Sequence, residues 1–329
     1  MPKRLLSLIT FGNDLEKLNY DWNNANQLLE EFNLNGFEIY PVAGYDLDLI
    51  PKSIFQGLHL QFFVLLQAIW RGSMSDLLSV FGTEENIRHF YGSIDRQVIV
   101  NKYQQQMEIA SQFEVDYTVF HAGQSDMEGI YTWQFPWDVW ESLDICSEIV
   151  NETTRGKNFT TPIYFENLWW PGSLQMRSQA EIEYLLNKVD YPDVGLVLDT
   201  GHLINTNLTI ESEEEAIDYV IKSIKELGDM RRMIKVVHLN LSLSASKIKA
   251  SIKQGVPTSD GDFWSRLNEG HYHVHQIDQH LPFQSTKIAK LFELIEPEFV
   301  VYEFSNTNLS EWKQQIESQN HSLSALKSI

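Results

Sequence analysis

The sequence is poor in the features that mark secreted and membrane proteins. It contains one cysteine, Cys146, so an internal disulfide framework is excluded and a reducing compartment is the better expectation. No stretch approaches the roughly 18 uninterrupted apolar residues that predict a transmembrane helix. Residues Met1–Asp14 contain a short apolar run without the cleavage site of a secretory signal, and they fit a first strand better. We therefore expect a cytoplasmic protein.

Positive charge is also scarce. The chain carries 25 Lys and Arg residues against 45 Asp and Glu residues, a formal net charge of −20. Such an excess repels nucleic acids and anionic membranes unless basic residues gather locally. The densest basic runs, Met230–Lys235 and Ser246–Lys253, fit solvated faces. We therefore expect no membrane partner, and nothing in the sequence indicates the oligomeric state.

The signatures of several enzyme classes are missing. The sequence has no G-x-S-x-G turn, no G-x-x-x-x-G-K-[ST] loop, no G-x-G-x-x-G and no C-x-x-C. Serine hydrolases of the elbow type, P-loop enzymes, dinucleotide-binding enzymes and dithiol oxidoreductases therefore have no support.

Short apolar runs that alternate with longer amphipathic segments make up most of the chain. This alternation predicts a parallel sheet with both faces covered. Eight units predict one (β/α)8 TIM barrel over residues 1–329, with active residues at the carboxyl ends of the strands. The polar segment Ser242–Gly270 follows the seventh run, and we expect an irregular insertion that forms a lid over the active face. The runs begin at Arg4, Gly36, Gly57, Tyr117, Pro162, Gly195, Ile234 and Phe299.

Ionisable side chains stand at the ends of nearly all runs from the third to the eighth, and in a barrel these ends converge on one axis. Four carboxylates packed together would raise one another's pKa values unless cations neutralise them. Imidazole with carboxylate suits zinc, manganese or iron. Nine ligands are too many for one ion and suit two or three, with zinc expected first. The set is His59, His121, Glu166, Asp199, His202, His238, Asp278, His280 and Glu303.

Each of these residues also has a structural interpretation. His59 or His121 alone would more often be a histidine satisfied within the core, Asp199 could be the N-cap of the next helix, and Glu303 could pair with a neighbouring base. Nine independent explanations are less economical than one shared explanation. The set as a whole therefore favours a metal site.

The ordered motifs FHAG, ENL, DTGH, HLN, DQH and YEF resemble the signatures of endonuclease IV, a family of xylose-isomerase-like TIM barrels also known as apurinic endonuclease family 2. The resemblance spans about His59 to Glu303. It implies that the nine residues above form a trinuclear zinc site and that the protein hydrolyses a phosphoester. For the hydrolase we expect Glu166 to bridge two ions and orient the nucleophile, while His59, His121 and Glu303 complete one part of the cluster. Glu166 and Glu303 are the expected catalytic residues.

Four positions differ from the endonuclease IV pattern and bear on the substrate. Phe62 stands where a tyrosine commonly follows the first ligand, Trp169 and Trp170 follow the EN pair, and Glu38 at a strand end resembles the sugar isomerases. Loops with basic and aromatic side chains for entering a duplex are not evident. We therefore expect a small phosphorylated or sugar-like substrate rather than duplex DNA, bound by Glu38, Trp169 and Trp170.

A second function stays open. The sugar and sugar-phosphate isomerases and epimerases of the same superfamily keep one metal on a smaller set, here Glu166, Asp199, His238 and Glu303. That resemblance implies that Glu166 and Glu303 form an acid–base pair that moves a proton between substrate carbons. The five additional ligands favour the hydrolase because an isomerase does not need them. A non-catalytic metal-binding protein is the third possibility.

Two further groups of side chains, the histidines of one short stretch and a pair of tryptophans, can be considered as site residues. The stretch HYHVH places His271, His273 and His275 at alternate positions, which on a strand would share one face. One of them could replace His280, but the order of the DQH motif favours His280. Trp137 and Trp140 lie in a helical pattern, and we expect them to pack outside the site.

Overall fold

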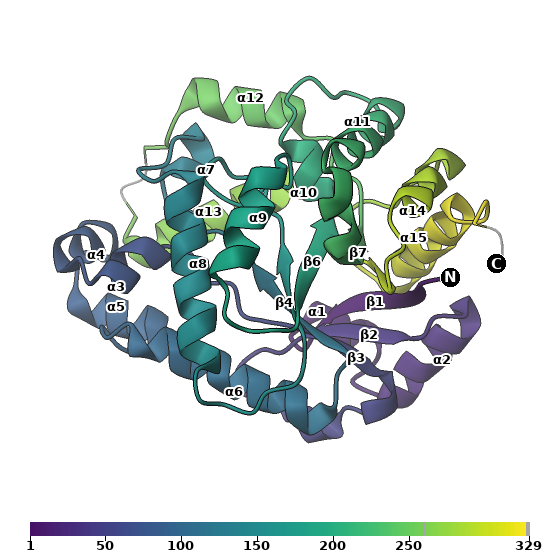
Figure 1. The fold of residues 1–329 in the computed structure, drawn as a ribbon, viewed down its shortest axis with the longest axis horizontal. Coiled ribbons are helices and arrows are strands. Elements are labelled where there is room, and N and C mark those ends of the chain that lie inside the picture. Colours follow the sequence, from purple (N-terminus) through teal and green to yellow (C-terminus); the bar gives the residue numbers. More distant parts are fainter. Residues whose placement is uncertain (259–260, 327–329) are drawn as a thin grey trace.

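The computed structural model describes residues 1–258 and 261–326. Eight parallel strands form a closed barrel in chain order, and β8 completes the ring by pairing with β1 (Figure 1). The predicted TIM-barrel fold is confirmed, and each predicted apolar run overlaps one strand, although β3 begins two residues before the predicted run. The strands are β1 (Lys3–Ile9), β2 (Gly36–Tyr40), β3 (Phe55–His59), β4 (Tyr117–His121), β5 (Ile163–Glu166), β6 (Val194–Asp199), β7 (Ile234–Leu239) and β8 (Phe299–Tyr302).

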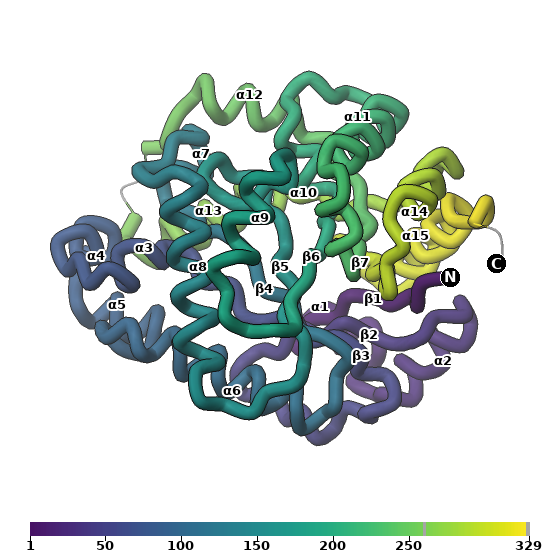
Figure 2. The backbone as a smooth tube through the Cα atoms, viewed as in Figure 1, coloured from purple at the N-terminus to yellow at the C-terminus, as the bar shows by residue number. Residues whose placement is uncertain are grey.

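Helices surround the strands, and the first strand lies beside the last helix (Figure 2). Arg4 of β1 donates a hydrogen bond to the side chain of Asn320 at 2.9 Å. The helices are α1 (Asn13–Lys17), α2 (Trp22–Phe32), α3 (Leu66–Arg71), α4 (Met74–Phe81), α5 (Glu84–Tyr91), α6 (Gln97–Phe113), α7 (Gly129–Thr132), α8 (Val139–Thr154), α9 (Gln179–Lys188), α10 (Thr200–Asn205), α11 (Glu213–Glu226), α12 (Ala245–Gln254), α13 (Phe263–Ile277), α14 (Leu291–Leu294) and α15 (Leu309–Ser322). Short 3-10 helices are η1 (Leu47–Leu49), η2 (Lys52–Ile54), η3 (Gly228–Met233) and η4 (Thr286–Lys290).

The inside of the barrel is filled at its amino-terminal end. A separate cluster of buried strand residues, among them Leu5, Tyr117 and Phe299, packs there. Successive strand residues point to opposite faces, so the next inward position lies two residues further on, nearer the carboxyl end. At five strands that position carries a predicted ligand. The pairs of cluster residue and ligand are Val119 and His121, Tyr164 and Glu166, Val197 and Asp199, Val236 and His238, and Val301 and Glu303.

Two predictions about the helical regions are wrong. The pattern over Glu84–Phe113 forms two helices, because α5 ends at Gly92, a glycine with φ +92° in the left-handed region that commonly ends helices. The segment Ser242–Gly270 is largely helical rather than irregular, since it contains α12 and half of α13. Residues 259–260 of this segment lie outside the described residues, and its role as a lid stays a prediction.

The HYHVH stretch lies on α13, so the prediction of a shared strand face is also wrong. The buried residues of this helix are Phe263, Leu267, Gly270 and Ile277, at spacings of four, three and seven residues that suit one helix face. Phe263 packs against Phe81 of α4, and Gly270 lies beside Ile130 of α7. On the helix His271 and His275, four residues apart, lie on one side, and His273 points in another direction. Over residues 1–258 and 261–326, no helix is both long and apolar enough to cross a membrane.

Candidate metal centre

Three predicted ligands meet at the ends of neighbouring strands. His59, His121 and Glu166 are the last residues of β3, β4 and β5. Oε2 of Glu166 lies 3.3 Å from Nε2 of His59 and 2.9 Å from Nε2 of His121. The three donor atoms lie within 4.8 Å of one another, so one cation could contact all three.

A second group forms where β6 turns into α10. Asp199 ends β6, His202 lies in α10, and His280 reaches in from the loop after α13, with their donor atoms within 4.8 Å of one another. Asp278 adds a carboxylate between the two histidines. Its Oδ2 lies 3.4 Å from Nε2 of His202 and 3.0 Å from Nε2 of His280.

A third group joins the first two. Glu166, Asp199, His238 and Glu303 offer donor atoms within 4.8 Å of one another. Nδ1 of His238 lies 3.3 Å from Oε1 of Glu166 and 3.2 Å from Oε2 of Glu303. Glu166 therefore turns one oxygen to the first group and the other to the third, and Asp199 belongs to the second and third. Shared carboxylates of this kind suit ligands that bridge cations.

In the part of the chain that the structure describes, several donor atoms of these groups lack hydrogen-bond partners, which suits the binding of divalent cations. Within the described residues, buried atoms that have no hydrogen-bond partner include Oε2 of Glu166, Nδ1 of His238 and Oδ1 of Asp278. Some of these lie close to an oppositely polar atom without the alignment that a hydrogen bond needs. Unsatisfied buried polar atoms are costly, and a cation contacted by imidazole and carboxylate would satisfy them. These clusters could hold two or three divalent ions.

The pKa values of the carboxylates are raised by burial and by one another, and lowered by the neighbouring histidines. Burial raises the pKa of Asp199 to about 7, and the nearby carboxylates of Glu303 and Glu166 add to the rise. Burial also opposes ionisation of Glu303, but His280 and His238 lower its pKa to about 2. The pKa values of His59, His202, His238 and His280 are raised by the neighbouring carboxylates, so their protonated forms offset the negative charge when no cation is bound, whereas burial lowers the pKa of His121. Cations would take over this role and displace those protons.

Backbone carbonyls fix which nitrogen two of the histidines present. Nδ1 of His59 lies 3.0 Å from the carbonyl oxygen of Leu60, and Nδ1 of His202 lies 2.7 Å from that of Asn167. Each Nδ1–H donates to its carbonyl, which leaves Nε2 to face the carboxylates. Such outer hydrogen bonds orient metal-binding imidazoles.

The helix-cap interpretation of Asp199 is confirmed by the structure, and its role as a metal ligand stays a prediction. Its Oδ1 accepts a 2.6 Å hydrogen bond from the backbone N–H of His202, so Asp199 caps α10. Its Oδ2 accepts a 2.7 Å bond from the side chain of Asn240. The side chain of Asn167 bonds both the N–H and the carbonyl of Asp199, at 2.8 and 3.0 Å. Asn167 and Asn240 were missed as site residues, although the ENL and HLN motifs contain them.

Glu38 does not lie where a substrate-binding residue was expected. Its side chain is 1% exposed, and its carboxylate contacts Nε2 of His238 at 3.1 Å and the hydroxyl of Tyr117 at 2.8 Å. The predicted contact with substrate therefore conflicts with its burial beneath the ligands. Tyr117 is a further residue of this site, and no sequence pattern pointed to it.

The tryptophans divide into two pairs. The ring of Trp169 lies 4.6 Å from the ring of His202, whereas Trp170 packs behind it in an apolar cluster with both side chains buried. Trp169 therefore supports a ligand, and the pocket-wall prediction for Trp170 conflicts with its burial. Trp137 packs against Phe135 and Trp140 against Tyr184, outside the ligand groups, as expected for outer packing.

The α13 histidines stay outside the three ligand groups found among the described residues. His273, for example, lies 3.1 Å from the carbonyl oxygen of Ile130 and 3.3 Å from the hydroxyl of Ser251. The site is least covered at His121, His280 and Glu303, whose side chains are 17 to 20% exposed.

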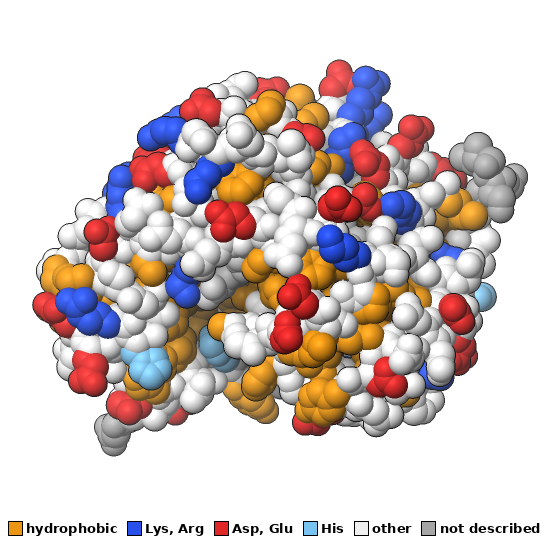
Figure 3. Space-filling model, turned by 90° about the horizontal axis from the view of Figure 1, so that it is seen from below, with side chains coloured by type: hydrophobic (Ala, Val, Ile, Leu, Met, Phe, Trp, Pro, Cys, Tyr) orange, Lys and Arg blue, Asp and Glu red, His pale blue; other side chains and the backbone are white. Residues whose placement is uncertain are grey.

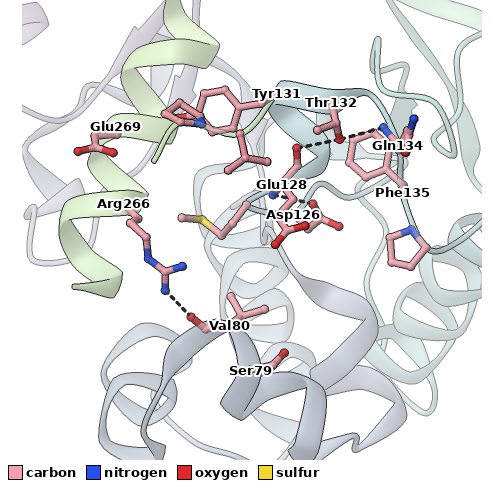
Figure 4. Close-up of a pocket in the computed structure, with 14 residues that line it drawn as sticks. Ser79, Val80, Asp126, Glu128, Tyr131, Thr132, Gln134, Phe135, Arg266 and Glu269 are labelled. Carbon is pink, nitrogen blue, oxygen red and sulfur yellow. Dashed lines mark hydrogen bonds between the residues drawn. The ribbon is translucent and has the colours of Figure 1, made fainter. Parts of the chain in front are cut away.

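A cavity of about 640 Å³ lies between α4, the segment after β4 and α13 (Figure 4). Arg266 reaches across it to donate a hydrogen bond to the carbonyl of Val80 at 3.1 Å. None of the nine predicted ligands lines this cavity. Seen from below, the molecule gathers hydrophobic side chains near its centre, while basic and acidic side chains are scattered (Figure 3).

Comparison with known sequences identifies one family. The sequence model described as xylose isomerase-like TIM barrel matches residues 73–320. No curated protein matches the sequence.

Solved structures with the same fold include enzymes of two kinds. Endonuclease IV from Thermus thermophilus is 15% identical, with 98% of this chain and 99% of that chain covered and a TM-score of 0.56. A D-tagatose 3-epimerase-like protein is 15% identical, with 98% and 97% covered and a TM-score of 0.52. An L-ribulose 3-epimerase is 9% identical, with 98% and 92% covered and a TM-score of 0.51. At these identities the likeness establishes the fold alone.

Proposed function

We propose a function for this chain from one premise, that it belongs to the xylose isomerase-like TIM barrel family. Endonuclease IV and sugar epimerases share the fold, so a metal-dependent enzyme is the common expectation. Between them, we propose a hydrolase that cleaves a phosphoester and holds two or three divalent ions, with zinc the first candidate.

The observation that carries the proposal is the presence of three ligand groups instead of one. An isomerase needs the Glu166, Asp199, His238 and Glu303 group alone. The histidines of the first and second groups have no evident purpose in such an enzyme, yet their Nε2 atoms face carboxylates at 2.9 to 3.4 Å. Several ions beside one another suit the charge changes of phosphoryl transfer.

Bound ions would supply Lewis-acid chemistry, polarising the phosphoryl group and making water a better nucleophile. The chain's own residues place that chemistry. Glu166 would fix the spacing of two neighbouring ions, because its two oxygens face different groups. His59 and His121 would complete the first position, Asp199, His202, Asp278 and His280 the second, and His238 and Glu303 the third. The less covered edge at His121, His280 and Glu303 would admit the substrate.

A sugar or sugar-phosphate isomerase or epimerase is the second candidate. One observation favours it: the third group is complete by itself, with Glu166 and Glu303 both within 3.3 Å of His238 Nδ1. These two carboxylates would then hold and move a proton on neighbouring substrate carbons.

Metal stoichiometry and substrate turnover test the proposal together. We expect two to three zinc ions per chain after reconstitution, hydrolysis of the model diester bis(p-nitrophenyl) phosphate, and loss of turnover in Glu166→Ala. Glu181→Gln, which alters a partly buried carboxylate on α9, is the matched control and should stay active. Cleavage of abasic-site DNA, followed as a function of salt, tests nucleic acid as the substrate.

Three outcomes contradict the hydrolase. A single ion per chain together with sugar interconversion would support the isomerase instead. Full activity of Glu166→Ala would remove the bridging role. Failure of the wild-type chain to bind metal at neutral pH would remove both enzyme candidates.

A further inference from the structure

Three residues beneath the metal centre lie at one level of the barrel. Glu38 of β2 is the register partner of Gly57 of β3, and Gly57 is the register partner of Tyr117 of β4. All three point inward, since they share the alternation that places His59 two residues beyond Gly57. The side chains of Glu38 and Tyr117 thus face each other across a strand that has no side chain between them.

The missing side chain of Gly57 is what allows the contact. A Cβ atom at this position would lie 2.5 Å from Cζ and 2.7 Å from Oη of Tyr117, closer than packed atoms approach. The phenol ring therefore crosses β3 through the space left by Gly57. Its hydroxyl reaches Oε2 of Glu38 at 2.8 Å and donates a hydrogen bond there.

The Glu38 carboxylate has a second partner on the far side of the barrel. Both of its oxygens lie 3.1 Å from Nε2 of His238 on β7. Glu38, Tyr117 and His238 are at most 1% exposed, so water does not compete for these contacts. A carboxylate accepts hydrogen bonds and donates none, so Nε2 must carry the proton in this pair.

A proton fixed on Nε2 leaves Nδ1 of His238 as the nitrogen that can bind a metal ion. Nδ1 of His238 faces Oε1 of Glu166 and Oε2 of Glu303, 3.3 and 3.2 Å away, so it is the nitrogen that would give up its proton and offer its lone pair to a cation held by the same group. Within the described residues it has no hydrogen-bond partner. An imidazole held in this way by a carboxylate is a better metal ligand, because its orientation is fixed and its basicity is raised.

We propose that Glu38, held in place by Tyr117, is a positioning residue that makes His238 present Nδ1 to the cation of the third ligand group. This inference rests on the proposed metal centre. It gives Glu38 a role through His238 rather than through the substrate.

Metal affinity provides the test, measured by competition with a chelating zinc dye. We expect Glu38→Ala to weaken one bound zinc ion by about 10- to 100-fold, the range found for such outer partners of metal-binding histidines. Glu38→Gln keeps an acceptor for Nε2–H but loses the charge, so its loss should be smaller. Tyr117→Phe should weaken the same ion by a few-fold.

Two matched controls separate this role from general damage. Tyr191→Phe removes another buried phenol hydroxyl, which donates to the carbonyl of Thr161 at 2.9 Å. Glu181→Gln removes a carboxylate on α9. Neither should change zinc affinity. A merely structural role would lower the free energy of unfolding of the Glu38 variants while leaving their zinc affinity equal to that of the wild type.

A second readout does not depend on zinc affinity. In zinc-saturated protein labelled with 15N-histidine, the NMR signals of His238 should report a neutral ring protonated at Nε2, and Glu38→Ala should lose this preference. Unchanged affinity and an unchanged tautomer in Glu38→Ala would overturn the proposal. If Glu38→Ala does not fold, the isosteric Glu38→Gln decides by its affinity.

The proposed function and this inference fail in different ways. If zinc binds but no phosphoester is cleaved, only the hydrolase fails, and the affinities of the Glu38 variants still decide the positioning role. If zinc binds to the wild type and to Glu38→Ala equally, only the positioning role fails. If the wild type binds no metal, both fail.

Discussion

Gly57 carries no side chain at the point where β3 passes beneath the metal centre, and the ring of Tyr117 occupies the space. The position therefore requires glycine for a close approach rather than for an unusual backbone conformation. A side chain there would push the ring away from Glu38 and disturb the layer on which His238 rests.

We expect Gly57→Ala to lower the free energy of unfolding by about 1–3 kcal/mol, the usual cost of overpacking a filled interior. Urea denaturation of the chelator-treated protein measures it. In a Tyr117→Leu background the same substitution should cost clearly less, because the clashing ring is gone. Equal costs in the two backgrounds would contradict the explanation.

The sequence could reveal site residues that follow a local strand pattern, but not those that act through contacts with residues far away in the chain. Six of the predicted ligands lie at the ends of strands, so their positions follow from strand alternation, whereas His202, Asp278 and His280 follow only from the order of the motifs. Glu38, Tyr117 and Asn240 act through contacts with residues far away in the sequence, and no local pattern reports such contacts. Trp170 looked like a wall residue beside the EN pair, but the turn after β5 buries it in an apolar cluster.

Among the elements, α8 and α11 show how local residues define the starts of the helices that surround the strands. Each begins with a capping box, formed by Asp138 with Glu141 and by Ser212 with Glu215. The reciprocal bonds satisfy backbone N–H groups that a helix start leaves free. Both helices then bury one apolar face against the barrel.

Removing one cap should have a measurable cost. We expect Asp138→Ala to destabilise the protein by about 1 kcal/mol, because a backbone N–H of α8 loses its acceptor. Thermal or urea unfolding measures the change. Asp229→Ala, at a highly exposed aspartate of η3, is the control and should fall within about 0.5 kcal/mol of the wild type. A similar loss in both variants would argue against a specific capping effect.

The sequence pattern predicts the strands better than it predicts the helix boundaries. All eight strands could be predicted, because strands buried on both faces form continuous apolar runs. Helix boundaries could not, since a left-handed turn at Gly92 divides one amphipathic pattern into α5 and α6. The polar composition of Ser242–Gly270 concealed α12, whose buried residues are only Ala245, Ile248 and Ser251.

For the whole molecule, the burial of groups that ionise at high pH makes the free energy of unfolding fall as the pH rises. Burial raises the pKa of the Cys146 thiol from 9.0 to about 12 and that of Tyr302 from 10.0 to about 12. In the unfolded chain both groups lose their protons at lower pH than in the folded chain. Their contribution to stability is therefore complete below about pH 9 and is lost as the pH rises towards 12.

We expect the free energy of unfolding to fall by several kcal/mol between pH 8 and pH 11, since each pKa unit is worth about 1.4 kcal/mol. Urea denaturation in the presence of a chelator measures this without a contribution from bound metal. Cys146→Ala should lose less stability over the same range, because it lacks one of the ionising groups. A stability independent of pH in this range would contradict the burial of these groups.

The ligand groups draw on six strands, β3 to β8, and on the loop that carries Asp278 and His280. The first group lies on β3, β4 and β5 alone, but the third group is incomplete until β8, which precedes Glu303, pairs with β1. Such long-range pairings form slowly, because the intervening chain must first be brought together. Cations that bind only the closed barrel would stabilise it by mass action. Chains that have not closed the ring would lack this stabilisation and stay open to proteolysis. In a cell, the supply of metal would set how much of this protein accumulates as well as how active it is.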